Sequence, residues 1–585
     1  MSILRNGAKL KKILGMGKKE KQQVALIATM MVMGAFLETL GVSMVVPLVL
    51  IVTQPGVMEQ NPIIRTICDI GGIHTEKTLL LAVLAGLAAV FIIKGLFLLA
   101  EYQMQFKFVH DNKLAVQRRL LRTYLKRPYE YFLGTDFSEI MQNITGNVNA
   151  AFTVFSHILG FFTEAVVSLF LAIAIFIIDP MMTVLVSVVL LLLMFFLLYI
   201  IRHILEREGR KKQKYGAQMT KWLLQAIHGI KEIKILQKEE YFLKNYIDAG
   251  RKQLEAERKN AILNRVPRIL IESFSVSAML LGIAVLVIRG RDVGEILPAL
   301  SAFAMAAVRL MPSAHRMVTY MNELAYYEPA IDRLVAYFED LDKEICEKKV
   351  VSDGQKRFSL KKQILLSGVS YHYPNMKKNV LTDAEICIPV GKSVGIVGAS
   401  GAGKSTTADI ILGLLKLQEG KVLADGVDVS ELHGEWLSCV GYIPQMIFML
   451  DDTIRSNVAF GIPKEEIDDG RVWEVLEEAQ LASFVRGLPE SLDTQIGEYG
   501  VRLSGGQRQR ISVARALYPD PDLLIFDEAT SALDKETEAA LIGSVKYLHG
   551  KKTMVIIAHR LETIEMCDIV YRVEGGQVSR VYGRI

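Results

Sequence analysis

The stretch GASGAGKST spans Gly398 to Thr406, and LSGGQ at Leu503 to Gln507 and LLIFDEATSALD at Leu523 to Asp534 follow it along the chain. The first stretch follows an apolar, strand-like run and precedes a helix-like segment, which is the context of a phosphate-binding loop. Its glycines let backbone N–H groups face phosphates, Lys404 reaches the terminal phosphates, and the Ser405 hydroxyl can ligate Mg²⁺. A Gly-rich turn that binds nothing is the alternative, and the partner motifs make it negligible.

The acidic pair follows a second apolar run. Leu523 to Phe526 are typical of a buried parallel strand, which delivers Asp527 and Glu528 at its carboxyl end, where ligands of open α/β sheets gather. We expect Asp527 to hold Mg²⁺ and Glu528 to orient and polarise the attacking water, because phosphoryl transfer needs mostly positioning and charge neutralisation. Alone, two adjacent acids would more often mark an exposed strand end without a role. Beside a phosphate loop they predict ATP hydrolysis.

Together these motifs resemble those of ATP-binding-cassette (ABC) nucleotide-binding domains, over residues 361–585. The remaining family motifs are VSYHYP with Tyr373, GYIPQ with Gln445, SALD with Asp534 and IIAHR with His559. The resemblance implies that Tyr373 stacks on adenine, with Tyr371 as a weaker candidate. It implies a catalytic set of Glu528, His559 and Gln445, a metal set of Ser405, Gln445 and Asp527, and nucleotide contacts from Tyr373, Gly398, Ser400, Gly401, Gly403, Lys404, Ser405, Thr406, Ser504, Gly505, Gly506, Gln507 and Asp534.

The single cassette predicts a dimer. In this family LSGGQ faces the ATP held by the phosphate loop of a second cassette, so each active site needs two chains. Lys404, Glu528 and His559 are all present, and Glu498 in GEYG resembles the exporter-type loop that contacts the membrane part. A homodimer would therefore carry two equivalent, competent sites. A heterodimer with a second half-transporter stays open.

The part of the chain before the cassette is predicted to be embedded in a membrane. The chain has 585 residues, and 51% of them are hydrophobic, which is too apolar for an ordinary soluble protein. The excess lies before residue 325, in segments that reach the roughly 20 apolar residues needed to cross a bilayer. The predicted spans are residues 24–52, 78–104, 151–178, 181–202, 266–289 and 294–320.

Basic residues set the expected orientation. The stretches before the first span, between the second and third, and between the fourth and fifth are rich in Lys and Arg, so we expect them and both termini to be cytoplasmic. The first apolar run is too long for a secretory signal and shows no cleavage site. These flanks explain the net charge of +5 without nucleic-acid binding. The five cysteines show no metal spacing, and Cys68 alone falls outside the presumed cytosolic part.

Long helix-forming stretches between the spans suggest that helices continue below the membrane and turn back near residues 132–140 and 229–238, which would touch the cassette. Six spans followed by a cassette resemble a half-size ABC exporter. The expected fold is multidomain: an all-α six-helix transmembrane domain at 1–328, a linker at 329–360 and an α/β P-loop nucleotide-binding domain at 361–585.

Charged residues inside the spans are the best sequence clue to cargo, since each costs at least about 2.5 kcal/mol at mid-bilayer and is normally turned toward a cavity or a partner. The candidates are Glu38, Lys94, Glu164, Arg268, Glu272 and Arg309. Three cations from three spans could line one pocket. Alternatively, Lys94 and Glu38 form a structural ion pair, Arg268 snorkels to the interface, or Arg268 pairs with Glu272 one turn later.

The segments FLETLGVSMVVPL, VPRILIES and VRLMPSAHR further resemble PglK-type flippases of lipid-linked oligosaccharides. The resemblance implies that Lys94, Arg268 and Arg309 bind the pyrophosphate of a polyprenyl-diphosphate glycan. Lys94 stands where the prototype has arginine, which keeps the charge and loses the bidentate fork. The implied location is the inner (cytoplasmic) membrane of a bacterial cell.

The sequence therefore predicts an ATP-driven, Mg²⁺-dependent flippase that acts as a homodimer among membrane lipids on a polyprenyl-diphosphate-linked glycan. A lipid or drug exporter shares every cassette motif and differs by an apolar cavity. A peptide exporter fits less well, because no peptidase domain precedes the spans. A soluble ABC-type ATPase of DNA repair or translation is disfavoured by the six spans.

Overall fold

The structure is a computed structural model of the chain. It describes residues 2–15, 17–43, 75–178, 180–288, 293–347, 357–374, 376, 378–432, 434–527, 535–557 and 564–581. The chain divides into two compact units. The helical unit comprises Met1–Arg127 and Thr135–Lys349, and the cassette unit comprises Pro128–Gly134 and Val350–Ile585.

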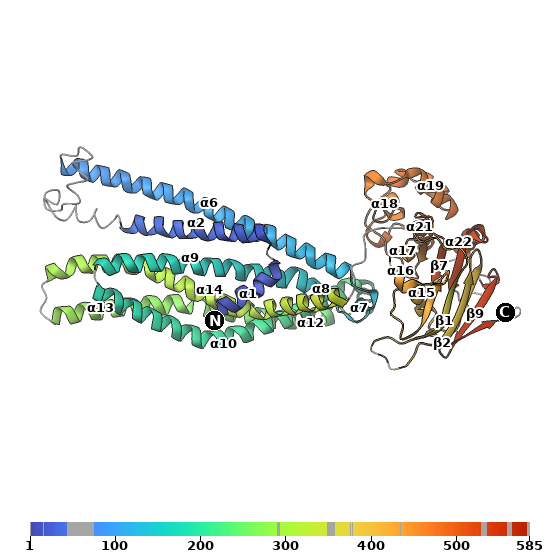
Figure 1. The fold of residues 1–585 in the computed structure, drawn as a ribbon, viewed down its shortest axis with the longest axis horizontal. Helices are drawn as coiled ribbons and strands as arrows, with labels where there is room; N and C mark the ends of the chain where they lie inside the picture. Colours follow the sequence, from blue (N-terminus) through green and yellow to red (C-terminus); the bar gives the residue numbers. More distant parts are fainter. Residues whose placement is uncertain are drawn as a thin grey trace. The chain divides into compact units, whose positions relative to one another are not determined.

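The helical unit consists of long helices joined by short ones (Figure 1). Its elements are α1 (Ser2–Leu14), α2 (Lys18–Ser43), α6 (Glu76–Leu125), α8 (Phe137–Met141), a π-helix (Gln142–Asn147), α9 (Val148–Ile178), α10 (Pro180–His228), α11 (Ile230–Leu236), α12 (Glu239–Leu263), α13 (Val266–Ile288) and α14 (Val293–Glu347). Helices α6, α10 and α14 have 50, 49 and 55 residues. At about 1.5 Å per residue each is far longer than a hydrocarbon core of about 30 Å.

The described part of each predicted span lies on its own helix, α2, α6, α9, α10, α13 or α14, and residues 44–52 of the first span lie outside the described residues. Among the described residues, three helical stretches are long and apolar enough to cross a bilayer, namely Lys18–Leu40, Lys77–Leu125 and Phe137–Ala174. The spans on α10, α13 and α14 include side chains outside the described set and stay predictions. The predicted linker, residues 329–360, begins inside α14, which continues to Glu347 because Leu334 and Phe338 are buried against neighbouring helices.

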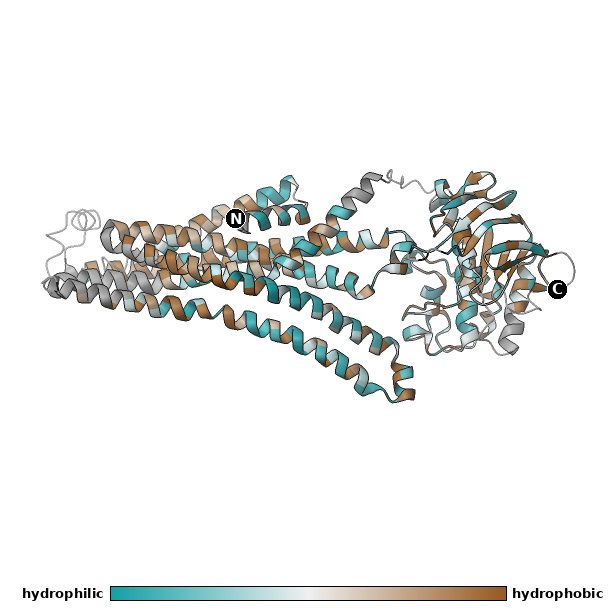
Figure 2. Ribbon diagram, turned by 90° about the horizontal axis from the view of Figure 1, so that it is seen from below, coloured by the Kyte–Doolittle hydropathy of each residue, from teal (hydrophilic) through white to brown (hydrophobic). Residues whose placement is uncertain are grey.

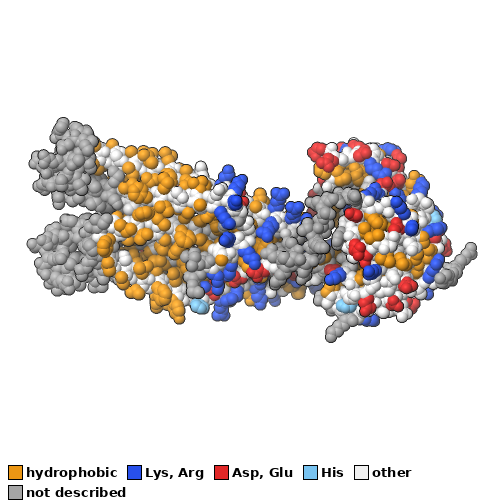
Figure 3. All heavy atoms as spheres, in the orientation of Figure 1, with side chains coloured by type: hydrophobic (Ala, Val, Ile, Leu, Met, Phe, Trp, Pro, Cys, Tyr) orange, Lys and Arg blue, Asp and Glu red, His pale blue; other side chains and the backbone are white. Residues whose placement is uncertain are grey.

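The surface of the helical unit changes character along its length. Figure 2 shows the long helices passing from apolar to polar residues, and Figure 3 shows exposed hydrophobic side chains over one part of the unit with Lys and Arg gathered beside them. On α6 the exposed fractions reach 64% for Ile92 and 65% for Leu96. An apolar belt next to basic residues is the pattern of a membrane-spanning region with its cytoplasmic flank.

Inside the helical unit, α9, α10, α13 and α14 pack together, while α2 and α6 run side by side (Figure 1). One core joins α1, α2, α6, α9 and α14, and another joins α10, α13 and α14. The approach of α10 to α14 depends on a glycine. A Cβ added to Gly209 would lie 2.0 Å from the backbone oxygen of Tyr326, so only glycine fits this crossing.

The cassette unit contains two sheets. The antiparallel sheet has the order β2-β1-β4-β5 and the second sheet the order β10-β9-β3-β8-β7-β6, in which only β10 is antiparallel to its neighbour. The strands are β1 (Gln363–Tyr371), β2 (Leu381–Pro389), β3 (Ser393–Val397), β4 (Glu419–Ala424), β5 (Val427–Asp428), β6 (Val440–Ile443), β7 (Leu523–Asp527), β8 (Thr553–Ile557), β9 (Ile569–Glu574) and β10 (Gln577–Val581).

The second sheet lies between two hydrophobic cores, and residues of β3, β7 and β8 contribute to both. The described helices of the cassette unit are α7 (Tyr129–Gly134), α15 (Lys404–Ile411), α16 (Val429–Leu432), α17 (Gly434–Leu437), α18 (Ile454–Val458), α19 (Asp469–Glu478), α20 (Ala482–Arg486), α21 (Gly505–Leu517) and α22 (Lys535–Leu548). Three 3₁₀ turns lie at Lys464–Glu466, Ser491–Asp493 and Glu498–Gly500. Every residue of β3, β7 and β8 is buried, as expected for central parallel strands. The predicted fold class, a helical membrane domain followed by an α/β P-loop domain, is confirmed.

Helix α7 belongs to the cassette unit although the chain reaches it from α6 of the helical unit. The prediction that a short element near residues 132–140 touches the cassette is therefore correct for α7. The second such element, predicted near residues 229–238, is α11, and it belongs to the helical unit.

Candidate functional site: a phosphate cradle at the carboxyl edge of the parallel sheet

Residues 398–406, here called the phosphate cradle, join the carboxyl end of β3 to the start of α15. Gly403 has φ 108°, and a Cβ there would lie 2.9 Å from Val380 Cγ1. A Cβ on Gly398 would lie 2.3 Å from the backbone oxygen of Val573. Both positions require glycine, so the loop keeps the tight curl that turns N–H groups inward.

Lys404 and its neighbours complete the cradle. The Lys404 side chain is buried within the loop, and its Nζ donates to the backbone oxygens of Gly398 at 3.1 Å and Ala399 at 3.0 Å. Ser400 and Gly401 lie exposed on the loop between them. Lys404 also begins α15, whose N-terminal N–H groups and dipole favour a negative charge at the same place. The cradle is thus a cationic concavity suited to a polyphosphate.

The carboxylate of Asp527 lies directly against the cradle. Ser405 Oγ donates to Asp527 Oδ1 at 3.0 Å, and Tyr442 OH donates to Asp527 Oδ2 at 3.3 Å. A hydroxyl and a carboxylate side by side are hard oxygen donors of the kind that Mg²⁺ prefers, so these residues fit the predicted metal. Among the residues that the structure describes, no cluster of three His, Cys, Asp or Glu side chains forms a separate metal site.

Burial and like charge perturb two groups near Asp527. Burial, with the charge of Asp527, raises the pKa of Asp409 on α15 to about 6. Burial and the same carboxylate raise the pKa of the Tyr442 hydroxyl, which therefore stays protonated and donates. Two acidic side chains, Asp409 and Asp527, therefore lie near each other at this edge, and a divalent cation bound there would offset their repulsion.

Gln445 lies two residues beyond β6, which pairs with β7 in parallel through Ile443 and Phe526. This pairing puts Gln445 and Asp527 at the same carboxyl edge of the sheet, and Gln445 is exposed there. Its predicted role at the γ-phosphate and metal stays a prediction. Glu528, Asp534 and His559 lie outside the described residues, and so their predicted roles also stay predictions.

The two tyrosines considered for adenine differ in their surroundings. Tyr373 is half-buried, and its hydroxyl lies 3.0 Å from Thr406 Oγ1 at the end of the cradle. Tyr371 is completely buried, with its ring edge-on to Tyr373 at a centroid separation of 5.3 Å and an interplanar angle of 80°. Of these two tyrosines, Tyr373 is the more accessible beside the cradle, and its predicted stacking on adenine stays a prediction.

The LSGGQ stretch forms a capped and exposed helix start. Ser504 Oγ accepts from the Gln507 N–H at 3.2 Å, and Gln507 Oε1 accepts from the Ser504 N–H at 2.8 Å, which is a capping box at the start of α21. Ser504 and Gly505 are exposed, while Gly506 is buried against the helix core. A Cβ on Gly505 would meet nothing within 4 Å, so the helix N-terminus is open to an approaching anion.

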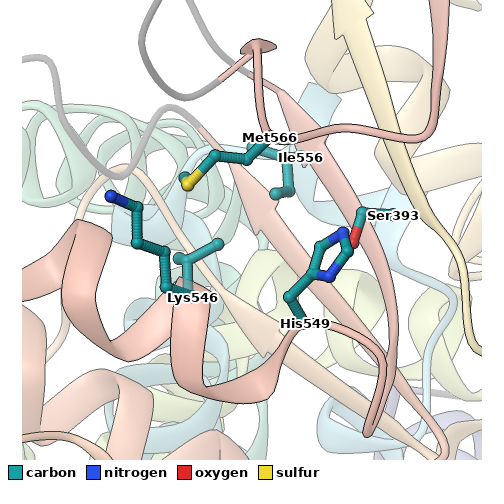
Figure 4. Close-up of a pocket in the computed structure, with 6 residues that line it drawn as sticks. Ser393, Lys546, His549, Ile556 and Met566 are labelled. Atoms are coloured by element: carbon teal, nitrogen blue, oxygen red, sulfur yellow. The ribbon is translucent and has the colours of Figure 1, made fainter.

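A different pocket of about 250 Å³ opens in the cassette unit (Figure 4). Ser393, Val545, Lys546, His549, Ile556 and Met566 line it. Ser393 is the first residue of β3, whereas the cradle follows the last, so this pocket lies at the opposite end of the strand. It is therefore separate from the nucleotide site.

The three predicted substrate cations have different environments. Lys94 Nζ lies 3.6 Å from Glu38 Oε1 and 5.3 Å from the centroid of the Phe91 ring. This is the structural ion pair that was the alternative to a substrate role. Arg268 is exposed near the start of α13, and the side chain of Arg309 lies outside the described set.

Arg316 on α14 was not among the charged residues predicted to matter for cargo. Its guanidinium forms an ion pair with Glu164 of α9, in which a terminal nitrogen donates to Oε2 at 3.0 Å and Nε lies 2.6 Å from Oε1. The rings of His157 and Tyr320, which lie on the same two helices, are tilted by 31° with their centroids 5.4 Å apart. Arg316 follows Arg309 by seven residues, or two helical turns, and this spacing could have identified it.

Comparisons with known proteins agree with the two-unit organisation. The family model described as ABC transporter matches residues 381–531, and the model described as ABC transporter transmembrane region matches residues 22–308. Together they cover about three quarters of the chain.

Among curated proteins, an ATP-dependent lipid A-core flippase of Pseudomonas fluorescens is 29% identical over 484 residues, which cover 80% of this chain and 76% of the relative. An uncharacterized ABC transporter ATP-binding protein, y4gM of Sinorhizobium fredii, is 28% identical over 507 residues, 84% of this chain and 83% of the relative. Among solved structures, a bacterial Atm1-family ABC exporter with ATP bound superposes with a TM-score of 0.74 at 20% identity, over 96% of this chain and 94% of that one. That likeness establishes the fold.

Proposed function

The chain belongs to the ABC transporters, as an exporter-type half-transporter whose ATPase cassette is coupled to transport, and from this premise we propose that it flips a polyprenyl-diphosphate-linked glycan across the bacterial inner membrane. Relatives named as lipid A-core flippases support a lipid as the class of cargo. The oligosaccharide-diphosphate head group goes beyond those names and is the finer part of the proposal.

The single observation that carries the head group is the presence of cations in the span regions of α13 and α14. Arg268 is exposed on α13, and Arg316 on α14 keeps 41% of its side chain exposed beside Glu164. Charged side chains at this depth normally face a cavity or a partner. Arginine also binds phosphate oxygens with a bidentate fork. Arg309, on the same helix as Arg316, is proposed as a further contact, while Lys94 contributes less because it is paired with Glu38.

In the proposed cycle two copies of the chain form a homodimer with the cassettes and both termini in the cytoplasm. Mg²⁺–ATP lies on the cradle of one copy and against Ser504, Gly505 and Gly506 of the other. Ser405, Asp527 and Gln445 hold the metal, which neutralises phosphate charge. Glu528 orients water, His559 contacts the γ-phosphate, and Asp534 completes the nucleotide contacts. ATP closes the cassettes, and hydrolysis resets them.

The deciding experiment measures ATP-dependent translocation of a polyprenyl-diphosphate oligosaccharide in proteoliposomes. The Glu528→Gln variant serves as the blank, and Arg268→Gln, Arg309→Gln and Arg316→Gln test the cations. Arg118→Gln is the matched control, since Arg118 is an exposed cation of α6 outside the predicted spans. We expect flipping by the wild type and the control only.

An exporter of other lipids, drugs or peptides is the competing function. Such a protein would keep its ATPase activity in the same preparation, show no diphosphate-glycan flipping and be little affected by loss of the arginines. That outcome would reject the glycan cargo and leave the exporter assignment intact. A lack of ATPase activity in the wild type would point instead to an incomplete dimer.

A further inference from the structure

Helix α7 makes a specific contact with the cassette through one carboxylate. Glu130 Oε1 accepts from the backbone N–H of Lys416 at 2.9 Å and from the Tyr371 hydroxyl at 3.3 Å. Lys416 lies in the loop after α15, and Tyr371 is the last residue of β1. One oxygen of α7 therefore joins two segments that both lead to the phosphate cradle.

The Tyr371 branch continues toward the adenine side of the site. The buried Tyr371 ring is edge-on to Tyr373, and the Tyr373 hydroxyl reaches Thr406 of the cradle at 3.0 Å. The contacts run from Glu130 through Tyr371 and Tyr373 to Thr406 without a gap. Burial, followed by the charge of Glu130, raises the pKa of Tyr371, so its hydroxyl stays protonated and can only donate to the carboxylate.

We propose that Tyr371 is a positioning residue. When adenine binds at Tyr373, Tyr371 transmits the resulting restriction in mobility to helix α7 through its hydrogen bond to Glu130. A base stacked on Tyr373 restricts that ring, the edge-to-face contact restricts Tyr371, and Tyr371 holds Glu130. The inference rests on the proposed function, because it needs Tyr373 to bind adenine. The proposal gives the base a role of its own. The phosphates bind and are hydrolysed at the cradle, whereas binding of the base restricts α7, the segment that connects to the membrane helices α6 and α9.

The Lys416 branch is the competing route. It follows α15, which starts at the cradle, and would report the phosphates rather than the base. The two routes differ in what they need from the nucleotide. A triphosphate without a base can engage the cradle and α15 but leaves Tyr373 uncovered.

The test measures amide hydrogen exchange of residues 129–134 in the full-length protein in lipid nanodiscs, with Mg²⁺ and either ATP or inorganic tripolyphosphate. We expect ATP to slow exchange in α7 by about fivefold or more, the lower end of typical coupling between sites, and tripolyphosphate to slow it less than twofold. Equal protection by the two ligands would assign the signal to the phosphates and overturn the proposal.

Substitutions at two positions, Tyr371 and Glu130, separate the relay from the fold. Tyr371→Phe keeps the ring and the contact with Tyr373 but removes the hydroxyl, so ATP-induced protection of α7 should be lost while the KM for ATP changes less than about twofold. Glu130→Gln keeps an oxygen acceptor and should retain most of the protection, whereas Glu130→Ala should lose it. The matched control is Tyr547→Phe, which removes an exposed hydroxyl from α22 of the same cassette. Unaltered protection in Tyr371→Phe would refute the relay.

A substitution at a third position, Tyr373, distinguishes failure of the relay from failure of the proposed adenine site. Tyr373→Ala should raise the KM for ATP and leave tripolyphosphate binding unchanged if Tyr373 binds the base. If it raises the KM while Tyr371→Phe has no effect on exchange, only the relay is wrong. If Tyr373→Ala leaves ATP binding unchanged, the proposed adenine site is wrong and the relay is rejected with it.

Discussion

Ser405 and Asp527, 122 positions apart in the sequence, lie in direct contact, with the serine hydroxyl donating to the carboxylate at 3.0 Å. Ser405 lies in the first turn of α15 after β3, Asp527 ends β7, and the strand order places both at the carboxyl edge of one sheet. If Ser405 and Asp527 hold Mg²⁺ as proposed, the fold already brings these two oxygen ligands together before the nucleotide binds.

This contact predicts a graded loss of metal binding. Ser405→Ala should raise the Mg²⁺ concentration for half-maximal ATPase activity by about tenfold or more, since one interaction with a charged group contributes about 1.5–3 kcal/mol. Tyr442→Phe removes only the 3.3 Å bond to the other carboxylate oxygen and should have a smaller effect. A magnesium titration of ATP hydrolysis measures both. An unchanged requirement in Ser405→Ala would exclude Ser405 as a ligand.

Replacing Glu528 by glutamine should stop turnover without preventing ATP binding. The amide cannot polarise water as the carboxylate does, and loss of a group in this role typically slows a reaction by about 10² to 10⁴-fold. Single-turnover hydrolysis and equilibrium binding of ATP separate the two steps. Wild-type hydrolysis in this variant would require another residue to act on the water.

Substitutions of Glu164 and of Arg316 should have opposite effects on the cargo concentration that the protein requires. Glu164 occupies the guanidinium of Arg316, which a diphosphate would need. The measured quantity is the lipid-diphosphate concentration that gives half-maximal stimulation of ATPase activity. Glu164→Gln should lower this concentration, and Arg316→Gln should raise it. The control pair is Arg202 and Glu206 on α10, which meet at 2.9 Å. If both variants only lower thermal stability and leave the concentration unchanged, the pair is structural.

The chemistry of the cassette was predictable because phosphate and metal binding fix residue types at short spacing, as in Lys404, Ser405 and Asp527. The spans on α2, α6 and α9 were predictable because length and hydropathy are local properties. Side-chain pairing between helices was not, because it depends on the rotation and relative height of helices far apart in sequence. Hydropathy could therefore place Lys94 and Glu164 in the membrane, but it offered the Lys94–Glu38 pair only as one alternative and did not indicate the pairing of Glu164 with Arg316.

The membership of α7 in the cassette unit was only partly predictable. Its sequence, YEYFLG, has no strong helix signal and no buried residue. What fixes it is the pair of hydrogen bonds accepted by Glu130, whose partners lie 241 and 286 positions later. A local reading of the sequence can suggest that a chain reversal touches the cassette, but only the fold shows which oxygen makes the contact.

The crossing of α10 and α14 predicts opposite outcomes for two glycines on the same helix. Gly209→Ala would place a methyl group against the Tyr326 backbone oxygen and should destabilise the helical unit by about 1–3 kcal/mol. Gly216→Ala is the matched control, because its nearest neighbour is the end of the Gln253 side chain at 3.4 Å and alanine favours a helix by up to about 1 kcal/mol. Thermal inactivation of the full-length protein in detergent compares them. Equal stability of the two variants would contradict the close crossing.

Asp409 predicts a pH dependence of cassette stability. Its pKa is raised from an ordinary 3.8 to about 6 by burial and the charge of Asp527, so the folded state holds the proton more tightly than the unfolded state does. Stability from this group is complete below pH 3.8 and is lost as pH rises through about 6. Since the side chain is only partly buried, the loss should be about 1–2 kcal/mol.

Melting of the full-length protein in detergent at pH 5 to 7.5, without nucleotide or Mg²⁺, provides the measurement. As pH rises, the melting temperature of the wild type should fall relative to that of Asp409→Asn. Asp451→Asn, a surface substitution in the same cassette, should leave the pH profile of the melting temperature unchanged. Mg²⁺ at Asp527 would offset the carboxylate repulsion and should reduce the shift. Parallel profiles for wild type and Asp409→Asn would mean that Asp409 does not titrate in this range, and that the charge near the metal site is balanced by another group.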